Sequence, residues 1–239
     1  MYNEKMGNDG AGKNIIVGID EVGRGPLAGD VAVCAVAYEK RRERMIRAAL
    51  SDVRDSKKMT PRARERAAAR ARELAGEGAL SFFVAFVSAK VIDRIGISRA
   101  ISLALGRALR RVSPDPESFV FLDGGLRAPR KYGNTETVVG GDARVFSIAL
   151  ASVIAKTARD EKMRRAGRMF PAYGFEKHKG YGTEAHRAAI RAHGPCPLHR
   201  RTFLRGILPK RKKQMRLSFP AGKECNRAAS ILELDARED

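Results

Sequence analysis

Short, almost wholly apolar runs that stop at charged or glycine-rich residues recur along the chain. The first is residues 15–19, Ile-Ile-Val-Gly-Ile, which is followed directly by Asp20 and Glu21. Runs of this length and composition are typical of strands that are buried on both faces of a sheet. We therefore predict strands at residues 15–19, 31–38, 82–87 and 119–122, and a further short strand at residues 135–139.

Longer stretches between these runs place apolar residues at helical spacing. One begins at Thr60-Pro61, where Thr is a good N-cap and Pro suits the first turn, and its Ala and Leu residues share one face. Another ends at Ser113-Pro114, because proline disfavours a helical conformation at the residue before it. The pattern also predicts helices at residues 41–50, 92–112 and 145–169. Strands that alternate with helices indicate an α/β fold.

The character of the chain changes at both ends of this pattern. Residues 1–13 are polar and glycine-rich, and we expect a flexible N-terminal tail there. Residues 14–208 carry the alternating pattern and are expected to form one domain, with its boundary near Leu208. Residues 209–239 begin with closely spaced Lys and Arg and continue as a polar stretch, which predicts a basic, disordered tail.

The charge balance points to a polyanionic partner. The 239 residues include 47 Lys and Arg against 27 Asp and Glu, a formal net charge of +20. A field of this sign and size attracts phosphate backbones, so nucleic acid is the expected partner. The alternative is a solvated, arginine-rich surface that has no such role.

Other features of the composition favour a cytoplasmic protein, which we expect to be a monomer. No apolar run approaches the ~18 residues that a membrane span requires, and the N-terminus has no apolar stretch that could act as a signal peptide. The three cysteines are odd in number and far apart, which is typical of a reducing compartment.

Acidic residues stand at the ends of the predicted elements. Asp20 and Glu21 follow one buried strand, Asp123 follows another, and Asp142 comes after two glycines, where we expect it to cap the long helix. In open α/β sheets, ligands bind at the carboxyl ends of the strands. If the two strands are parallel neighbours, these four carboxylates converge, and their mutual repulsion needs a cation.

Hard divalent cations with oxygen ligands meet that need. Two Mg²⁺ or Mn²⁺ ions about 3.5 to 4 Å apart would activate water against a phosphodiester and stabilise the leaving oxygen. The constellation therefore predicts a metal-dependent nuclease. Taken singly, Asp142 could be an ordinary helix cap, and the Asp-Gly-Gly at 123–125 an ordinary turn.

At this point the sequence resembles a known family. The opening motif Gly-Ile-Asp-Glu-Val-Gly-Arg-Gly-Pro-Leu-Ala-Gly at 18–29 is similar to that of type 2 ribonuclease H, ribonuclease HII. Further blocks match in order at 55–60, 122–124, 141–143 with 151–156, 173–183 and 194–201. Several long ordered blocks make a more specific signal than any single short motif.

The resemblance implies a ribonuclease H-like mixed central sheet flanked by helices, with a C-terminal helical portion. It assigns the two metal ions to Asp20, Glu21, Asp123 and Asp142. The implied activity is hydrolysis of the RNA strand of RNA–DNA hybrids and cutting on the 5′ side of ribonucleotides embedded in duplex DNA. The products would carry 3′-hydroxyl and 5′-phosphate ends.

The resemblance also implies substrate-binding positions. The loop Gly23-Arg24-Gly25 is expected at the ribose 2′-hydroxyl and flanking phosphates, and Tyr181 against the deoxyribose next to the ribonucleotide. Ser56, Lys57 and Lys58 are further implied positions, the two lysines through phosphates. The chain departs from the family at Gly140, where a Lys is common, which is expected to affect rate or metal preference but not coordination.

Rival interpretations have weaker support. A non-catalytic nucleic-acid-binding protein of the same fold would keep the charge without needing all four acids. Residues 7–14 nearly spell a P-loop, but Asn14 replaces the Ser or Thr that holds Mg²⁺. His193, Cys196 and His199 have metal-like spacing, yet two intervening prolines favour a structural role over zinc. A type 3 ribonuclease H would need an additional N-terminal domain, which the short lead before the first strand cannot hold.

The C-terminal stretch contains one further candidate. Residues 214–219, Gln-Met-Arg-Leu-Ser-Phe, resemble the short peptide with which bacterial replication and repair proteins bind the sliding clamp. Peptides of this kind insert apolar anchors into a preformed groove. The alternative is a solvated tail whose Leu217 and Phe219 pack back on the domain.

Overall fold

A mixed five-stranded sheet forms the centre of the computed structural model, which describes residues 14–113 and 115–208. The strand order is β3-β2-β1-β4-β5. Strands β1, β2 and β3 pair antiparallel, whereas β4 pairs parallel to both β1 and β5. The strand bounds are β1 Ile15–Val22, β2 Val31–Glu39, β3 Ser81–Val87, β4 Phe119–Asp123 and β5 Thr135–Val138.

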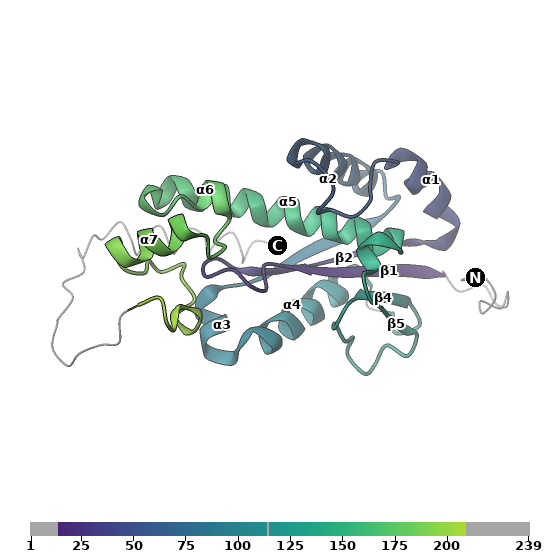
Figure 1. Ribbon diagram of the computed structural model, residues 1–239. Coiled ribbons are helices and arrows are strands. Elements are labelled where there is room, and N and C mark those ends of the chain that lie inside the picture. The colour runs from purple at the N-terminus through teal and green to yellow at the C-terminus, as the bar shows by residue number, and fades with distance from the viewer. Residues whose placement is uncertain (1–13, 114, 209–239) are drawn as a thin grey trace.

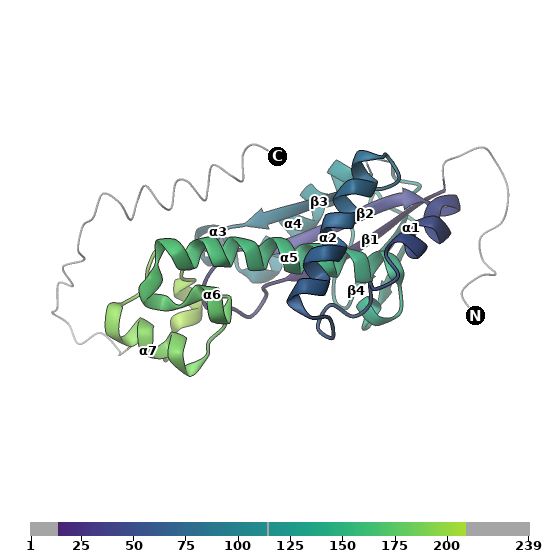
Figure 2. The ribbon, with the colours of Figure 1, turned by 90° about the horizontal axis from the view of Figure 1, so that it is seen from above.

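Helices cover both faces of this sheet. The long helix α5 (Phe146–Met169) crosses one face, with α1 (Glu43–Ala49) and α2 (Pro61–Gly76) beside it, as Figures 1 and 2 show. Helices α3 (Ala89–Ile95) and α4 (Ile97–Val112) lie on the opposite face. The α/β prediction of a mixed sheet flanked by helices is confirmed.

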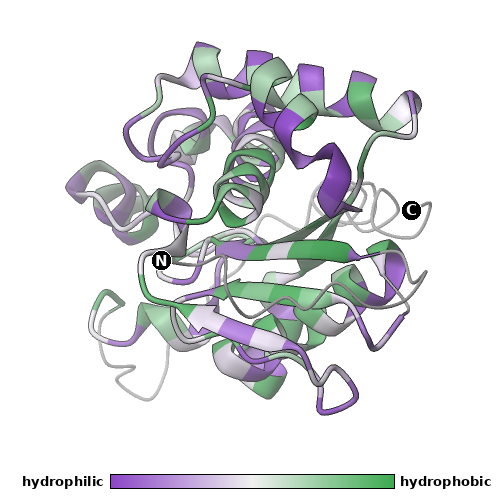
Figure 3. Ribbon diagram, turned by 90° about the vertical axis from the view of Figure 1, so that its right-hand side faces the viewer, coloured by the Kyte–Doolittle hydropathy of each residue, from purple (hydrophilic) through white to green (hydrophobic). Residues whose placement is uncertain are grey.

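Two apolar cores result, one on each side of the sheet. Alternate residues of β1 point to opposite faces, so that Val17 and Ile19 pack towards α4 while Ile16 packs towards α5. Figure 3 shows the hydrophobic strands in the middle of the molecule and more hydrophilic residues on the surrounding helices. Burial on both faces explains why the central strands are apolar without alternation.

The first strand is longer than its apolar run. Residues 15–19 were expected to stop before the acids, but β1 continues to Val22 because it stays paired with β2. Its parallel pairing with β4 ends earlier, at Ile19 opposite Leu122. The backbone of Asp20 and Glu21 is therefore paired with β2 on one side, whereas on the other side it is not paired with β4.

Three helix predictions need correction. The continuous helix at residues 92–112 is wrong, because Gly96 (φ +82°) separates α3 from α4. The helix at residues 41–50 begins as a 3-10 turn, η1 (Lys40–Arg42), and becomes α1. Asp142 does not cap α5: the N-cap is Val145, and Asp142 lies in the preceding turn η2 (Gly141–Ala143).

The C-terminal part is helical, as expected from the resemblance. It consists of short elements that lie at one end of α5 (Figure 2), in the order η3 (Pro171–Tyr173), α6 (Phe175–His178), α7 (Glu184–His193) and η4 (Arg201–Leu204). Phe175 and Met163 belong to a small core that joins this part to α5.

Some predictions fall outside the described residues. The tails at 1–13 and 209–239, and with them the clamp-like peptide, remain predictions, as do the monomeric state and the cytoplasmic location. Within the described part of the chain, no helix is both long and apolar enough to cross a membrane.

The contact between β1 and the start of α5 offers a test of the fold. A Cβ on Gly18 would lie 2.1 Å from the backbone carbon of Ser147, so Gly18→Ala must push the helix away from the strand. We expect a loss of about 3 kcal/mol in the free energy of unfolding, measured by urea denaturation.

Gly106→Ala is the matched control. A Cβ there meets only Arg110 Nη1 at 3.8 Å, and alanine is the better helix former, so α4 should gain about 0.5 to 1 kcal/mol. Equal effects of the two substitutions would contradict the close approach at Gly18.

Candidate active site

The carboxyl ends of β1 and β4 bring acidic residues from distant parts of the sequence together. Because these parallel strands are paired up to Ile19 and Leu122, Asp20 and Asp123 follow at the same edge of the sheet. The negative charge of Asp123 acts on both Asp20 and Glu21, which shows that these three carboxylates are near one another. The expected convergence of these strand ends is present.

Asp20 is the most deeply buried of these acids. Its side chain accepts hydrogen bonds from the Glu21 N–H at 2.7 Å and from the Ser152 hydroxyl, and the residue is only 6% exposed. Burial, followed by the charges of Asp123 and Glu21, raises the pKa of Asp20 to about 7. A carboxylate in this position is costly to ionise unless a cation joins it.

Asp123 and Asp142 are linked through the turn between β5 and α5. Asp123 Oδ1 accepts from the Gly141 N–H at 2.7 Å. A Cβ on Gly141 would come within 2.5 Å of Ile148 Cδ1 and 3.3 Å of Asp123 Oδ1, so a larger residue there would have to displace the end of the Ile148 side chain. The turn η2 then presents Asp142, which is 7% exposed, at the same edge.

Two basic side chains pair with the acids. Arg24 Nη1 lies 3.2 Å from Glu21 Oε1, and Lys57 Nζ lies 3.3 Å from Asp142 Oδ2. The charge of Asp142 raises the pKa of Lys57. Burial raises the pKa of Glu21, and Arg24 opposes that rise. Both cations are largely exposed, so each pair is weak and exchangeable.

The donor chemistry of this edge fits a divalent metal ion. Four carboxylates supply the hard oxygen ligands that Mg²⁺ and Mn²⁺ prefer. In the described residues, however, no three His, Cys, Asp or Glu side chains are yet arranged as a group that could hold an ion. Their oxygens are instead directed at Arg24, Lys57 and backbone N–H groups, so metal binding requires these contacts to be exchanged.

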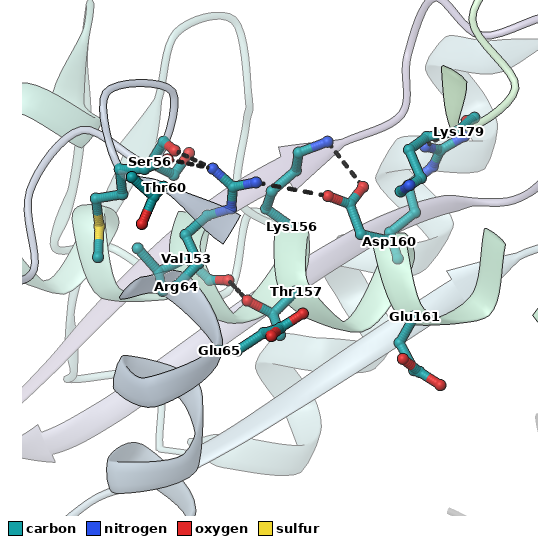
Figure 4. A network of polar contacts seen from close by, with 12 residues as sticks. Ser56, Thr60, Arg64, Glu65, Val153, Lys156, Thr157, Asp160, Glu161 and Lys179 are labelled. Atoms are coloured by element: carbon teal, nitrogen blue, oxygen red, sulfur yellow. Dashed lines mark hydrogen bonds and ion pairs between the residues drawn. The ribbon is translucent and has the colours of Figure 1, made fainter. Parts of the chain in front are cut away.

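The loop that carries Lys57 is anchored to α5 by a buried arginine. Arg64 donates to the carbonyls of Ser56 and Met59, and its Nη2 lies 3.7 Å from Asp160, which also binds Lys156 (Figure 4). This network fixes the loop and leaves the side chain of Lys57 in solvent.

Ser56 lies beneath the carboxylates. Its hydroxyl is 2.8 Å from that of Ser152, the residue that also bonds Asp20, and Ser56 is only 5% exposed. Direct contact of Ser56 with substrate stays a prediction; in this structure it supports Asp20 through Ser152. Lys58 is exposed, and its Nζ lies 3.8 Å from Asp55 Oδ2.

The Gly23-Arg24-Gly25 loop and the Tyr181 turn meet around a second buried arginine. Arg159, on α5, donates to the carbonyls of Ala28, Asp30 and Lys179, and its guanidinium lies 5.9 Å from the Tyr181 ring centre. A Cβ on Gly23 (φ +89°) would lie 2.2 Å from Arg159 Nε. Tyr181 itself is 41% exposed, so its ring is accessible.

Sequence reasoning missed the residues that support the site. Ser152, Arg64 and Arg159 had not been assigned a role, and Arg200 had been interpreted only as a structural residue of the resemblance. Position 64 falls on the buried face of α2 with Ala67, Ala68 and Ala71, so helical spacing marks an arginine there as unusual. No such signal exists for Arg159 or Arg200, whose partners are backbone carbonyls far away in the chain.

The candidate zinc residues have other partners. His199 Nδ1 accepts from the Cys196 N–H at 2.9 Å, and His199 Nε2 lies 3.1 Å from His186 Nε2. These ring nitrogens bond within the protein, and the residues serve the packing of the C-terminal part.

A mixed sheet with acidic residues at the ends of two parallel strands is the arrangement expected of a ribonuclease H-like nuclease. The family model for ribonuclease HII matches residues 17–206, and the chain belongs to this family. Ribonuclease HII of Thiobacillus denitrificans is 45% identical over 188 residues, which span 79% of this chain and 86% of that protein. Ribonucleases HII are metal-dependent nucleases, so the chain is a hydrolase of this kind.

Solved structures of lower identity share the fold. RNase HII from Archaeoglobus fulgidus, in a complex with PCNA, has a TM-score of 0.64 at 22% identity and covers 84% of this chain and 98% of that one. Bst-RNase HIII in complex with Mn²⁺ has a TM-score of 0.59 at 22% identity, with 93% of this chain and 71% of that chain covered. The ribonuclease H-like architecture is confirmed.

The raised pKa of Asp20 predicts a pH-dependent stability. Between the unfolded value of 3.8 and the folded value of about 7, the folded protein holds a proton that the unfolded chain has lost. Stability must therefore fall as the pH rises through this window. Asp20→Asn removes the titration, so in the absence of divalent metal the variant should exceed the wild type at pH 8 by roughly 2 to 4 kcal/mol.

Urea unfolding at pH 4 and pH 8 in EDTA measures this difference. At pH 4 the two proteins should be nearly equal, because Asp20 is then protonated in the fold. Mg²⁺ at pH 8 should stabilise the wild type more than the variant. An unchanged difference between the two pH values would show that Asp20 ionises normally.

Proposed function

We propose that this protein hydrolyses the RNA strand of RNA–DNA hybrids and cuts on the 5′ side of ribonucleotides embedded in duplex DNA. The observation that carries the proposal is that Asp20, Glu21 and Asp123 lie at one sheet edge, beside the Gly23-Arg24-Gly25 loop. The turn that carries Asp142 is tied to the same edge by the hydrogen bond from the Gly141 N–H to Asp123. Membership of the ribonuclease HII family supports the same substrate class.

Asp20, Glu21, Asp123 and Asp142 would hold two divalent metal ions. Such ions, when bound, polarise the phosphodiester, provide a nucleophile from water and stabilise the leaving oxygen. The Mn²⁺ complex of Bst-RNase HIII, which shares this fold, supports divalent metal use. Mg²⁺ or Mn²⁺ would serve, and the expected products carry 3′-hydroxyl and 5′-phosphate ends.

Lys57 and Arg24 have two tasks in this scheme. Before metal binds, they lower the repulsion among the acids by pairing with Asp142 and Glu21. Afterwards their charges are available to phosphates, because both side chains are exposed and need only rotate. In this exchange of partners, the negative charge of the carboxylates is balanced first by Lys57 and Arg24 and then by the metal ions. The two freed cations draw the nucleic-acid backbone towards the carboxylates.

Substrate selection falls to backbone and ring contacts. Glycines at 23 and 25 let the main chain approach a ribose closely, and only RNA offers a 2′-hydroxyl. The exposed ring of Tyr181, held over Arg159, suits stacking on the neighbouring deoxyribose. Together they would place a ribonucleotide next to DNA in the site.

A duplex with one embedded ribonucleotide tests the proposed function. With Mg²⁺ or Mn²⁺, the labelled strand should be cut on the 5′ side of the ribonucleotide, as mapped by denaturing gel electrophoresis of the products. Asp123→Asn should lower the rate roughly a thousandfold or more, because it weakens a metal ligand, and should leave binding of the duplex nearly unchanged.

Asp115→Asn is the control for the charge change, since Asp115 is exposed near the other end of β4 and its Oδ1 only caps Glu117 N–H. It should cut at the wild-type rate. Equal cutting of an all-DNA duplex, or full activity of Asp123→Asn, would refute the assignment. Binding without any cleavage would favour the non-catalytic alternative.

We also propose that residues 214–219, which lie outside the described residues, bind a sliding clamp. The motif and the PCNA complex of the Archaeoglobus fulgidus protein support this. Leu217→Ala with Phe219→Ala should reduce binding to the clamp at least tenfold in a titration, while cleavage of short duplexes stays unchanged. Absence of clamp binding by the wild-type protein would refute this role.

A further inference from the structure

Arg200 is fully buried, and its guanidinium binds the Gly23-Arg24-Gly25 loop. The residue is 0% exposed, and its guanidinium donates three hydrogen bonds to carbonyl oxygens: Nε to Gly29 at 2.9 Å, Nη1 to Arg24 at 2.9 Å and Nη2 to Gly23 at 2.7 Å. Burial, and then the charge of Arg159, lowers the pKa of Arg200 to about 9, so it remains a cation at neutral pH. A buried cation is costly unless its donors are satisfied, and here the loop satisfies them.

These bonds set the direction of two peptide groups. In a trans peptide the C=O and the N–H point in opposite directions. When the carbonyls of Gly23 and Arg24 point at Arg200, the N–H groups of Arg24 and Gly25 must point away from it. These are the two donors at the centre of the loop proposed to meet the ribose.

The residue before Arg200 connects to the Tyr181 turn. His199 Nδ1 lies 2.9 Å from the N–H of Cys196 and 3.3 Å from the Cys196 carbonyl oxygen. The shorter contact is with a group that can only donate, so Nδ1 is an acceptor and Nε2 carries the proton. His199 Nε2–H then donates to His186 Nε2 at 3.1 Å, which leaves His186 Nδ1–H to donate to the carbonyl of Tyr181 at 2.9 Å.

This chain of bonds is directional and needs both rings to be neutral. Burial lowers the pKa of His186 and lowers that of His199 to about 4, so both rings are neutral at physiological pH. His186 is fully buried and His199 is 2% exposed, which restricts other orientations. The dipeptide His199-Arg200 thus contacts one loop through its arginine and the other through its histidine.

We propose that Arg200 is a positioning residue that aims the N–H groups of Arg24 and Gly25 at the ribose, and that His199 and His186 hold the Tyr181 turn in register with that loop. This inference rests on the proposed function and names the residues that would determine its preference for a ribonucleotide next to DNA. Neither Arg200 nor the histidines need touch the substrate.

Binding in an inactive background tests this role. In the Asp123→Asn protein, the dissociation constants are measured for a duplex with one ribonucleotide and for the all-DNA duplex of the same sequence. Their ratio is the discrimination. Arg200→Lys keeps the charge but cannot make three forked bonds, so discrimination should fall at least tenfold, while affinity for all-DNA duplex changes less than threefold.

In the active protein, the same Arg200→Lys substitution should raise the KM for the ribonucleotide duplex at least tenfold and change kcat less than threefold. The carboxylates at the sheet edge are untouched by it. A loss confined to kcat would overturn the positioning role.

Asp93→Ala is the matched structural control. Asp93 accepts from the N–H groups of Arg201 and Thr202 and from the Thr202 hydroxyl, so it anchors the same η4 segment without touching the substrate loop. It should lower the Tm and leave discrimination within twofold of the parent protein. Equal losses of discrimination in Asp93→Ala and Arg200→Lys would show that Arg200 acts only through stability.

His186→Asn keeps the test decisive if Arg200→Lys does not fold. Asn can replace Nδ1–H towards the Tyr181 carbonyl but cannot reach His199, so discrimination should fall at least threefold. Unchanged discrimination in whichever of these variants folds overturns the inference alone. If the parent protein itself binds both duplexes equally, the proposed substrate preference fails, and the inference fails with it.

Discussion

Repulsion among the carboxylates at the ends of β1 and β4 is the constraint on which the arrangement of the site depends. Asp20 is buried beside Asp123, and burial together with this second charge makes its ionisation unfavourable. The protein lowers the energy with N–H groups, the Ser152 hydroxyl and two exposed cations. Because those cations lie at the surface, the proposed metal ions could take their place at the carboxylates without disturbing either core, and the freed cations could then pair with phosphates.

Buried arginines solve a different problem, which is to hold loops that have little apolar surface of their own. Arg64 fixes the loop before α2, Arg159 joins α5 to the turns at Ala28 and Lys179, and Arg200 holds the Gly23-Arg24-Gly25 loop. Each cation is solvated by backbone carbonyls instead of water. A planar guanidinium with several donors can fix several peptide groups at once, which a lysine cannot do.

Local pattern was sufficient for most of the fold. The four apolar runs became strands β1 to β4, and the central ones are apolar throughout because both of their faces are covered. The more polar stretch at residues 135–139 became the edge strand β5. Thr60 and Pro61 start α2 as their cap preferences predict. The break at Gly96 was missed, since apolar spacing continues across it and only the backbone angle at that glycine separates the two helices.

The sequence by itself determined which acids stand at element ends, and its ordered motifs determined the family. Only the tertiary structure decided that β1 and β4 are parallel neighbours, that Asp142 faces Lys57 rather than capping α5, and that Arg200 reaches back to Gly23. The physical reason is range. Burial and capping depend on residues a few positions apart, whereas charge pairs and carbonyl contacts join segments separated by up to 177 positions and leave no local periodicity.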